Sequence, residues 1–315
     1  MPIEQFIIFF LLLLTGYFCK KYGIFNDAAI NAINKFIVVI GYPCLILGRT
    51  VTLEMEHSIF INFLISLFLN VGLLLAFGAY ARLYCRGKRF PDADKRVTEF
   101  AIMSPNNGFM GFPVAYTIFG SLGLLYMIGA NIALNVVFFT YGIALFDRGR
   151  NVSGETVGKK FLKGLKTFAH PGIIAAFAGI VICYNRIQLP EIASGYLDLV
   201  GAVTIPVAMI SIGTMLAGGF GLKSFKKSLV MDPVLNKLFV VPVITVIIIW
   251  FIPLDPLVKT IIIVSNAMPV ATMVPIFSEQ YGHNKSYASE MVVISTLFSM
   301  ITIPVAVWIL PNLGL

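Results

Sequence analysis

The sequence predicts an all-α integral membrane protein with ten transmembrane helices. The chain of 315 residues is 58% hydrophobic and only 12% charged, whereas a soluble protein carries roughly 25% charged residues. Its apolar residues fall into runs of about 20, the length that crosses a bilayer. Most of the 23 lysines and arginines lie in short stretches between these runs and alternate from side to side, as transmembrane topology requires.

Ten apolar runs, bounded by charged or turn-rich stretches, are the expected spans. The first lacks a basic leader and a small-residue cleavage site, so we expect a retained helix and not a signal peptide. The second is the least apolar at its start, where Asn31, Asn34 and Lys35 lie. In order, the expected spans are residues 3–19, 28–50, 58–84, 97–119, 122–146, 170–187, 194–218, 234–253, 257–280 and 287–310.

The basic residues orient these spans. With the N-terminus outside, the outward loops keep only Arg49, Arg186 and Lys259, and positive charge gathers on the cytoplasmic side of a membrane. We therefore expect a multi-pass protein of the cell membrane with both termini outside, and we attribute the net charge of +8 to topology and not to nucleic-acid binding. The inward loops hold Lys20, Lys21, Arg82, Arg86, Lys88, Arg89, Lys95, Arg96, Arg148, Arg150, Lys159, Lys160, Lys163, Lys166, Lys223, Lys226, Lys227, Lys237 and Lys285.

The chain is expected to divide into two repeats of five spans. The first repeat covers 1–146 and the second covers 170–315, with a basic cytoplasmic linker at 147–169. An odd number of spans in each repeat makes the second enter the membrane in the opposite sense. The two repeats are therefore expected to have inverted topology.

Two pairs of spans contain residues that interrupt a regular helix. The fourth span reads SPNNGFMGFP at 104–113, and the ninth is interrupted at 265–269. The second and seventh spans are expected to break at Pro43 and Pro206. Because freed backbone groups cost several kcal/mol each in hydrocarbon, the broken spans are expected to cross inside the protein and form the substrate site.

The residues at the fourth and ninth breaks suit an organic anion. Half-helix N-termini carry partial positive charge and attract anions, and the amides of Asn106, Asn107 and Asn266 can donate to a carboxylate. Gly108 lets a ligand approach the backbone closely. Each Asn can also cap its own half-helix, which is compatible with ligand contact. Cys19, Cys44, Cys85 and Cys183 are scattered, so neither a metal site nor a cofactor is expected.

Few ionisable residues lie within the spans. Lys35 either snorkels to the cytoplasmic interface or helps to attract the anion. Asp198, near the outer end of the seventh span, is the best candidate for coupling to a proton or a cation. Transport without coupling is also open, because membrane potential alone drives an anion outward.

The broken spans resemble those of the auxin efflux carrier family. SPNNGFMGFPVA in the fourth span resembles that family's Asn-Gly and Phe-Pro signature, and SNAMPVATMVPIFSEQYG in the ninth is similar to its second crossover. KFIVVIGYPCLIL and IPVAMISIGTMLAGG resemble its other broken spans. The resemblance covers the whole chain and is greatest to bacterial members, which include malate and malonate permeases.

The resemblance implies a fold with two crossing broken helices, like that of bile-acid symporters and NhaA, an elevator-type motion and often a homodimer. It implies a carboxylate site beside Pro113 and Pro269, contacted by Asn266 and by either Asn106 or Asn107.

The expected function is secondary transport of a small organic anion across the lipid bilayer. The alternative is a sodium- or proton-coupled organic-anion symporter of the bile-acid type. An enzyme is not expected, because His57, His170 and His283 lie at span ends and no GxSxG or HExxH motif occurs. These residues specify neither the anion nor the direction of transport.

Overall fold

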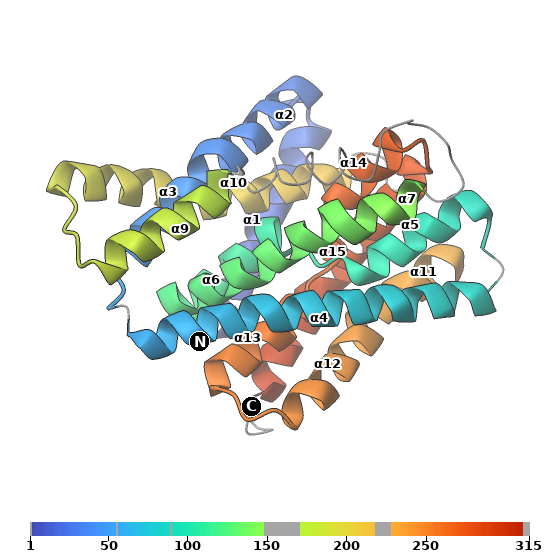
Figure 1. Cartoon of the computed structure of the whole chain (residues 1–315). Coiled ribbons are helices and arrows are strands. Elements are labelled where there is room, and N and C mark those ends of the chain that lie inside the picture. Colours follow the sequence, from blue (N-terminus) through green and yellow to red (C-terminus); the bar gives the residue numbers. More distant parts are fainter. Residues whose placement is uncertain (1, 55, 89, 148–170, 218–227, 311–315) are drawn as a thin grey trace. The chain divides into compact units, whose positions relative to one another are not determined.

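The computed structural model describes residues 2–54, 56–88, 90–147, 171–217 and 228–310, and these residues are almost entirely helical (Figure 1). The expected all-α class is therefore confirmed for the described residues. The predicted basic linker at 147–169 lies outside them, apart from Asp147 at the end of α7.

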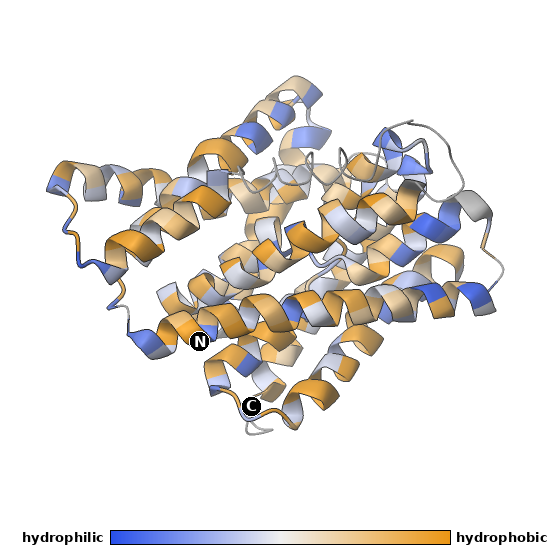
Figure 2. Cartoon of the chain, in the orientation of Figure 1, coloured by the Kyte–Doolittle hydropathy of each residue, from blue (hydrophilic) through white to orange (hydrophobic). Residues whose placement is uncertain are grey.

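Several helices are long and apolar enough to cross a membrane. Six such segments occur in the described residues, and α9 (Pro171–Tyr184) and α13 (Pro256–Ala267) are shorter apolar helices. Hydrophilic residues in α4 gather mainly towards its ends, with mostly hydrophobic residues between them (Figure 2). This pattern is that of a multi-pass membrane protein, while the count of ten spans stays a prediction. The six segments are Asp27–Thr50, His57–Gly87, Asn107–Phe146, Glu191–Ala217, Ser228–Trp250 and Lys285–Ile309.

The chain forms two compact units, and each draws on both halves of the sequence. The first comprises Met1–Ile65, Phe109–Gly129 and Phe168–Gly219. Its helices include α1 (Pro2–Lys21), α2 (Asp27–Phe36), η1 (Ile37–Gly41), α3 (Tyr42–Thr50), α9 and α10 (Glu191–Ala217). Within this unit α10 packs against α1 and α3, and α3 packs against α9.

Glycines allow α1 and α10 to approach at backbone distance. A Cβ atom built on Gly213 would lie 2.1 Å from the carbonyl oxygen of Leu13, and one on Gly16 would lie 1.9 Å from that of Ile210. No side chain fits at such distances. Small residues of this kind draw membrane helices together, since van der Waals packing replaces the hydrophobic driving force in lipid.

The expected breaks at Pro43 and Pro206 are continuous helix in the structure. Pro43 is in the first turn of α3, directly after the π-helical turn η1. That wider turn accommodates the proline ring without ending the helix. Pro206 lies inside α10, which runs from Glu191 to Ala217, and a membrane helix can tolerate the hydrogen bond that proline removes.

The second unit contains the interrupted ninth span and the fourth span as far as Gly108, whereas Phe109–Gly129 belong to the first unit. It comprises Ser66–Gly108, Ala130–Thr167 and Phe220–Leu315. Phe100, Phe138 and Phe277 pack together in it, with ring centroids 4.6 to 5.8 Å apart. Its helices are most of α4 (His57–Gly87), α5 (Asp92–Met103), the end of α6 (Phe112–Val137), η3 (Phe138–Gly142), α7 (Ile143–Asp147), α11 (Ser228–Leu235), η6 (Asn236–Val240), α12 (Val241–Trp250), α13, α14 (Met273–Gln280) and α15 (Lys285–Ile309).

Gly120 divides the long apolar segment that contains α6. Its φ of 69° and ψ of −160° are not helical, and only glycine adopts this conformation readily. The sequence predicts the turn between the fourth and fifth spans at this place, between residues 119 and 122.

Candidate functional site

The two interrupted spans are joined at their breaks, within the second unit. The backbone N–H of Asn106 donates to the carbonyl of Pro269 at 2.8 Å, and that of Ala271 donates to the carbonyl of Ser104 at 2.9 Å. Pro105 and Val270 face each other in an isolated antiparallel bridge. These bonds satisfy backbone groups that the helix interruptions release, so the breaks support each other. The expectation that the breaks meet is confirmed.

The helix ends are displaced from their expected places. α5 ends at Met103, and the helix resumes at Asn107 as the π-helical η2 (Asn107–Gly111). α13 continues to Ala267, and α14 begins only at Met273. Asn266 therefore lies in the last turn of α13 and does not directly precede the resuming helix. The apolar run and the absence of proline between Pro256, at the start of α13, and Pro269 allow α13 this extra length.

The sequence pairs Pro113 with Pro269, but the structure places a different proline of the first break in the position equivalent to Pro269. Pro105 and Pro269 each lie two residues after the end of a half-helix, at Met103 and Ala267. Pro113 is buried in the first turn of α6, beyond the break. The structural counterpart of Pro269 is therefore Pro105, and the contact of a carboxylate with Pro113 stays a prediction.

The first break concentrates buried polar atoms without partners. Ser104, Asn106 and Asn107 are 0%, 3% and 1% exposed. Ser104 Oγ, Asn106 Nδ2 and both side-chain polar atoms of Asn107 have no hydrogen-bond partner among the described residues. Burying such a group unpaired costs about 1–3 kcal/mol. A cluster of them points to a ligand or water that completes their bonds.

The second break is different, because most of its side-chain groups are satisfied internally. Asn266 Nδ2 donates to Asn70 Oδ1 at 3.0 Å and to the Ile262 carbonyl at 2.9 Å. Ser265 Oγ also donates to Asn70 Oδ1, at 3.0 Å. Only Asn266 Oδ1 lacks a partner among the described residues. Asn266 could donate to a carboxylate only after exchanging one of these bonds.

Gly108 follows the unpartnered amides and has room beside it. A methyl group at this position would meet only Asn131 Oδ1, at 3.8 Å. Asn131 belongs to the same unit, on the second part of α6. It adds an amide to the vicinity of the first break that sequence reasoning did not select.

The two candidate coupling residues belong to the first unit, whereas the polar side chains of the joined breaks belong to the second. Asp198 on α10 pairs with Arg49 on α3 at 3.2 Å, and the Arg49 guanidinium lies 5.1 Å from the centre of the Tyr116 ring. Lys35 is exposed in the last turn of α2. The Arg49 pair gives Asp198 a structural role that its sequence position did not reveal.

Replacing Asp198 by asparagine is expected to change transport by less than about twofold, because a half-exposed ion pair contributes only about 0–1 kcal/mol. Initial uptake rates at several cation concentrations measure the effect. Glu191→Gln, a similar charge removal at an exposed site on α10, is the control. Loss of cation dependence in Asp198→Asn alone would assign coupling to Asp198.

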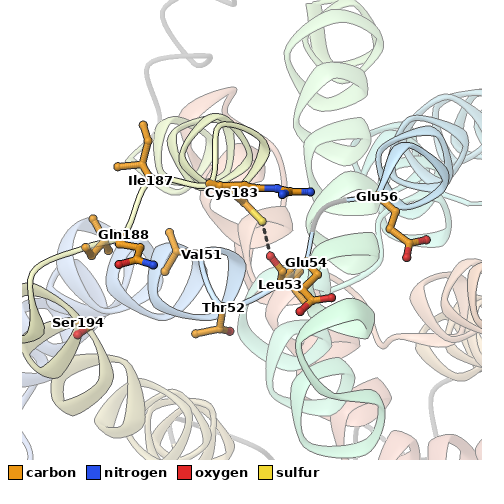
Figure 3. Close-up of a pocket in the computed structure, with 11 residues that line it drawn as sticks. Val51, Thr52, Leu53, Glu54, Glu56, Cys183, Ile187, Gln188 and Ser194 are labelled. Carbon is orange, nitrogen blue, oxygen red and sulfur yellow. Dashed lines mark hydrogen bonds between the residues drawn. The ribbon is translucent and has the colours of Figure 1, made fainter.

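A cavity of about 820 Å³ lies entirely in the first unit, at the loops that follow α3 and α9. Figure 3 shows Cys183 directed toward Leu53, whose carbonyl accepts a hydrogen bond from the Cys183 thiol. Glu54 and Glu56 line the cavity together with Arg186. The two carboxylates disfavour a small anion there, and none of the predicted site residues lines this cavity.

Sequence reasoning missed two polar residues of the second unit. Asn70, 1% exposed on α4, links Ser265 and Asn266. Lys237 was assigned to a cytoplasmic loop, but it lies in η6 with no exposed surface. An amide and a cation inside otherwise apolar runs are the signals that could have identified them, although Asn62 gives the same signal in the run that holds Asn70.

Comparisons with known proteins agree with a transport role. The model of a family described as "Membrane transport protein" matches residues 2–308. A protein of Methanocaldococcus jannaschii named "Uncharacterized transporter" is 26% identical over 99% of both chains. A protein of Rhizobium meliloti named "Putative malonate transporter" is 24% identical, over 94% of this chain and 91% of its own length.

Proposed function

Since the chain belongs to the family of membrane transport proteins whose model spans residues 2–308, we propose that it is a secondary carrier that binds a small organic anion at the joined breaks. The family and the transporter names of its relatives make the protein a transporter and not an enzyme. They also confirm its resemblance to the auxin efflux carrier family.

The observation that carries the proposal is the set of unpartnered amides at the first break. Asn106 and Asn107 offer buried N–H donors without partners in the described residues. Amide donors bind a carboxylate without holding it by a full opposite charge, so the anion can also be released. The N-terminal end of η2 adds partial positive charge beside Asn107.

Malonate is the first candidate substrate. It rests on the name of the Rhizobium meliloti relative, at low identity, and on an amide-lined site that suits any small carboxylate. Malate fits the same chemistry. We place this carrier in the cell membrane with both termini outside and propose that it works as a homodimer.

An elevator-type motion is consistent with the two compact units. The polar groups of both breaks belong to one unit, which could carry the anion as a single body. Each unit also combines spans from both expected repeats. One unit holds the first, second, sixth and seventh spans, the other holds the eighth to tenth and most of the third and fifth, and the fourth span is divided between them after Gly108. This distribution supports the proposal of two inverted five-helix repeats, at 1–146 and 170–315.

A cation-coupled symporter is the second candidate. Asn107 Oδ1 and Asn266 Oδ1 are buried acceptors without partners in the described residues. Amide oxygens are ligands for hard cations, so a sodium ion could neutralise the anion at the breaks.

Malonate is expected to stabilise the purified carrier in detergent, because a ligand at about 100 times its Kd adds about 2.7 kcal/mol to the free energy of unfolding. Thermal unfolding with malonate, malate and acetate measures this, and malonamide is the uncharged control. The absence of a shift with every carboxylate would contradict the proposal. Repeating the unfolding series with sodium or choline tests whether a cation strengthens binding. Uptake into proteoliposomes with an imposed potential then separates symport from uniport.

A further inference from the structure

Lys237 is a charged side chain buried completely beside the joined breaks. It is 0% exposed and lies in the π-helical turn η6. η6 packs against α5 and α13, the two half-helices that end at the breaks. All these elements belong to the second unit.

The ammonium group is held by the end of α13. Lys237 Nζ donates to the carbonyl of Asn266 at 3.3 Å. The last carbonyls of a helix lack intrahelical partners and carry partial negative charge. A cation in this position compensates the end of α13, but a single long hydrogen bond satisfies only one of the three donors of an ammonium group.

Lys237 has no neutralising carboxylate among the described residues. It forms no ion pair within the part of the chain that the structure describes. A buried charge without an opposite charge costs several kcal/mol, and in a membrane span it is expected only where it has a function. Methionine would fill a similar volume without this cost, so folding alone does not account for a lysine here.

We propose that the ammonium group of Lys237 balances the charge of a bound carboxylate at the joined breaks. It acts through space, as a positioning charge, while the amides of Asn106 and Asn107 make the contacts. The dipoles of the half-helices at the breaks oppose one another, because both N-terminal and C-terminal ends meet there. Lys237 therefore adds the full positive charge beside the second break, while the buried Glu99 lies on α5, one turn before Met103. This inference rests on the proposed function.

The charge also explains how an amide site could prefer dianions. Attraction between buried charges is screened weakly, so each unit of ligand charge strengthens binding. An uncharged amide pocket gives a much smaller difference between a dianion and a monoanion. Lys237 is thus inferred to set the charge preference of the carrier.

The test compares malonate with its half ester, monomethyl malonate, as matched dianion and monoanion. Lys237→Met is expected to weaken malonate binding at least about tenfold, to weaken monomethyl malonate less, and to keep or raise the melting temperature. Lys237→Arg is expected to restore the preference for malonate. Lys259→Gln, a charge removal near the start of α13, is the control and should change neither affinity. Isothermal titration calorimetry gives the affinities.

Three results would overturn the inference. The first is unchanged malonate affinity in Lys237→Met. The second is an equal loss for both ligands together with a lower melting temperature, which would mean that Lys237 only supports the fold. For these two results, Lys237→Gln is measured against the same criteria if Lys237→Met does not fold. The third is a wild-type protein that binds neither ligand, in which case the proposed function fails and the inference fails with it.

Discussion

Replacing Asn107 by leucine is expected to stabilise the empty carrier and to remove most of its affinity for the anion. Asn107 is buried, and both polar atoms of its side chain lack partners among the described residues. Leucine has a similar shape and carries no group that needs a hydrogen bond, so the free energy of unfolding should rise by about 1–3 kcal/mol. Losing an amide donor to a carboxylate should weaken binding at least about tenfold.

The matched control for Asn107→Leu is Asn266→Leu. Asn266 uses its Nδ2 group for two bonds inside the protein, so its replacement should lower the free energy of unfolding by about 1–3 kcal/mol. Thermal unfolding and malonate titration of both variants separate the two roles. If Asn107→Leu were as destabilised as Asn266→Leu, the first break would be a structural element and not a ligand site.

Gly213→Ala is expected to destabilise the first unit by about 2–3 kcal/mol, at the upper end of the cost of overpacking. The added Cβ would lie 2.1 Å from the carbonyl oxygen of Leu13. Backbone cannot move aside as a flexible side chain can, so α1 and α10 must separate along their contact. Denaturant or thermal unfolding in detergent measures this loss.

Gly195→Ala is the control for Gly213→Ala, because it makes the same change on the same helix in open space. It should be neutral or stabilising by up to about 1 kcal/mol, since alanine is the better helix former. The folded fraction of Gly213→Ala should still bind malonate, because Gly213 is not in the unit that holds the joined breaks. Equal unfolding curves for Gly213→Ala and wild type would contradict the close packing of α1 against α10.

These expectations assign different work to different polar residues at one site. The side-chain amides at the first break, which have no partner among the described residues, are available to a ligand, whereas the amide of Asn266 holds α13 to Asn70 on α4. Lys237, whose Nζ donates to the carbonyl of Asn266, contributes positive charge next to the second break. Rigid support of one break by the other keeps the free amides in place, as a preorganised binding site requires.

Local sequence patterns predicted much of the fold. Apolar runs of about 20 residues cross lipid as helices, because a helix satisfies its own backbone groups. The composition of 104–113 predicted an interruption, and Pro105 lies in it, whereas Pro113 lies in the helix that continues from η2 into α6. Pro43 and Pro206 were predicted wrongly as interruptions by the same rule. A π-helical turn before Pro43 and tolerance of one lost bond at Pro206 keep those helices continuous.

The sequence alone determined the membrane class, the family resemblance and the presence of polar interruptions within two spans. Only the tertiary structure decided that Pro105 pairs with Val270 and that Lys237 is buried. It also decided that the side-chain amide of Asn107 has no partner among the described residues, whereas that of Asn266 has two. The physical reason is that apolar periodicity and helix breaking are local properties of the chain. Whether a polar group is satisfied depends on partners such as Asn70, which lies far from Asn266 in sequence and reaches it only through packing.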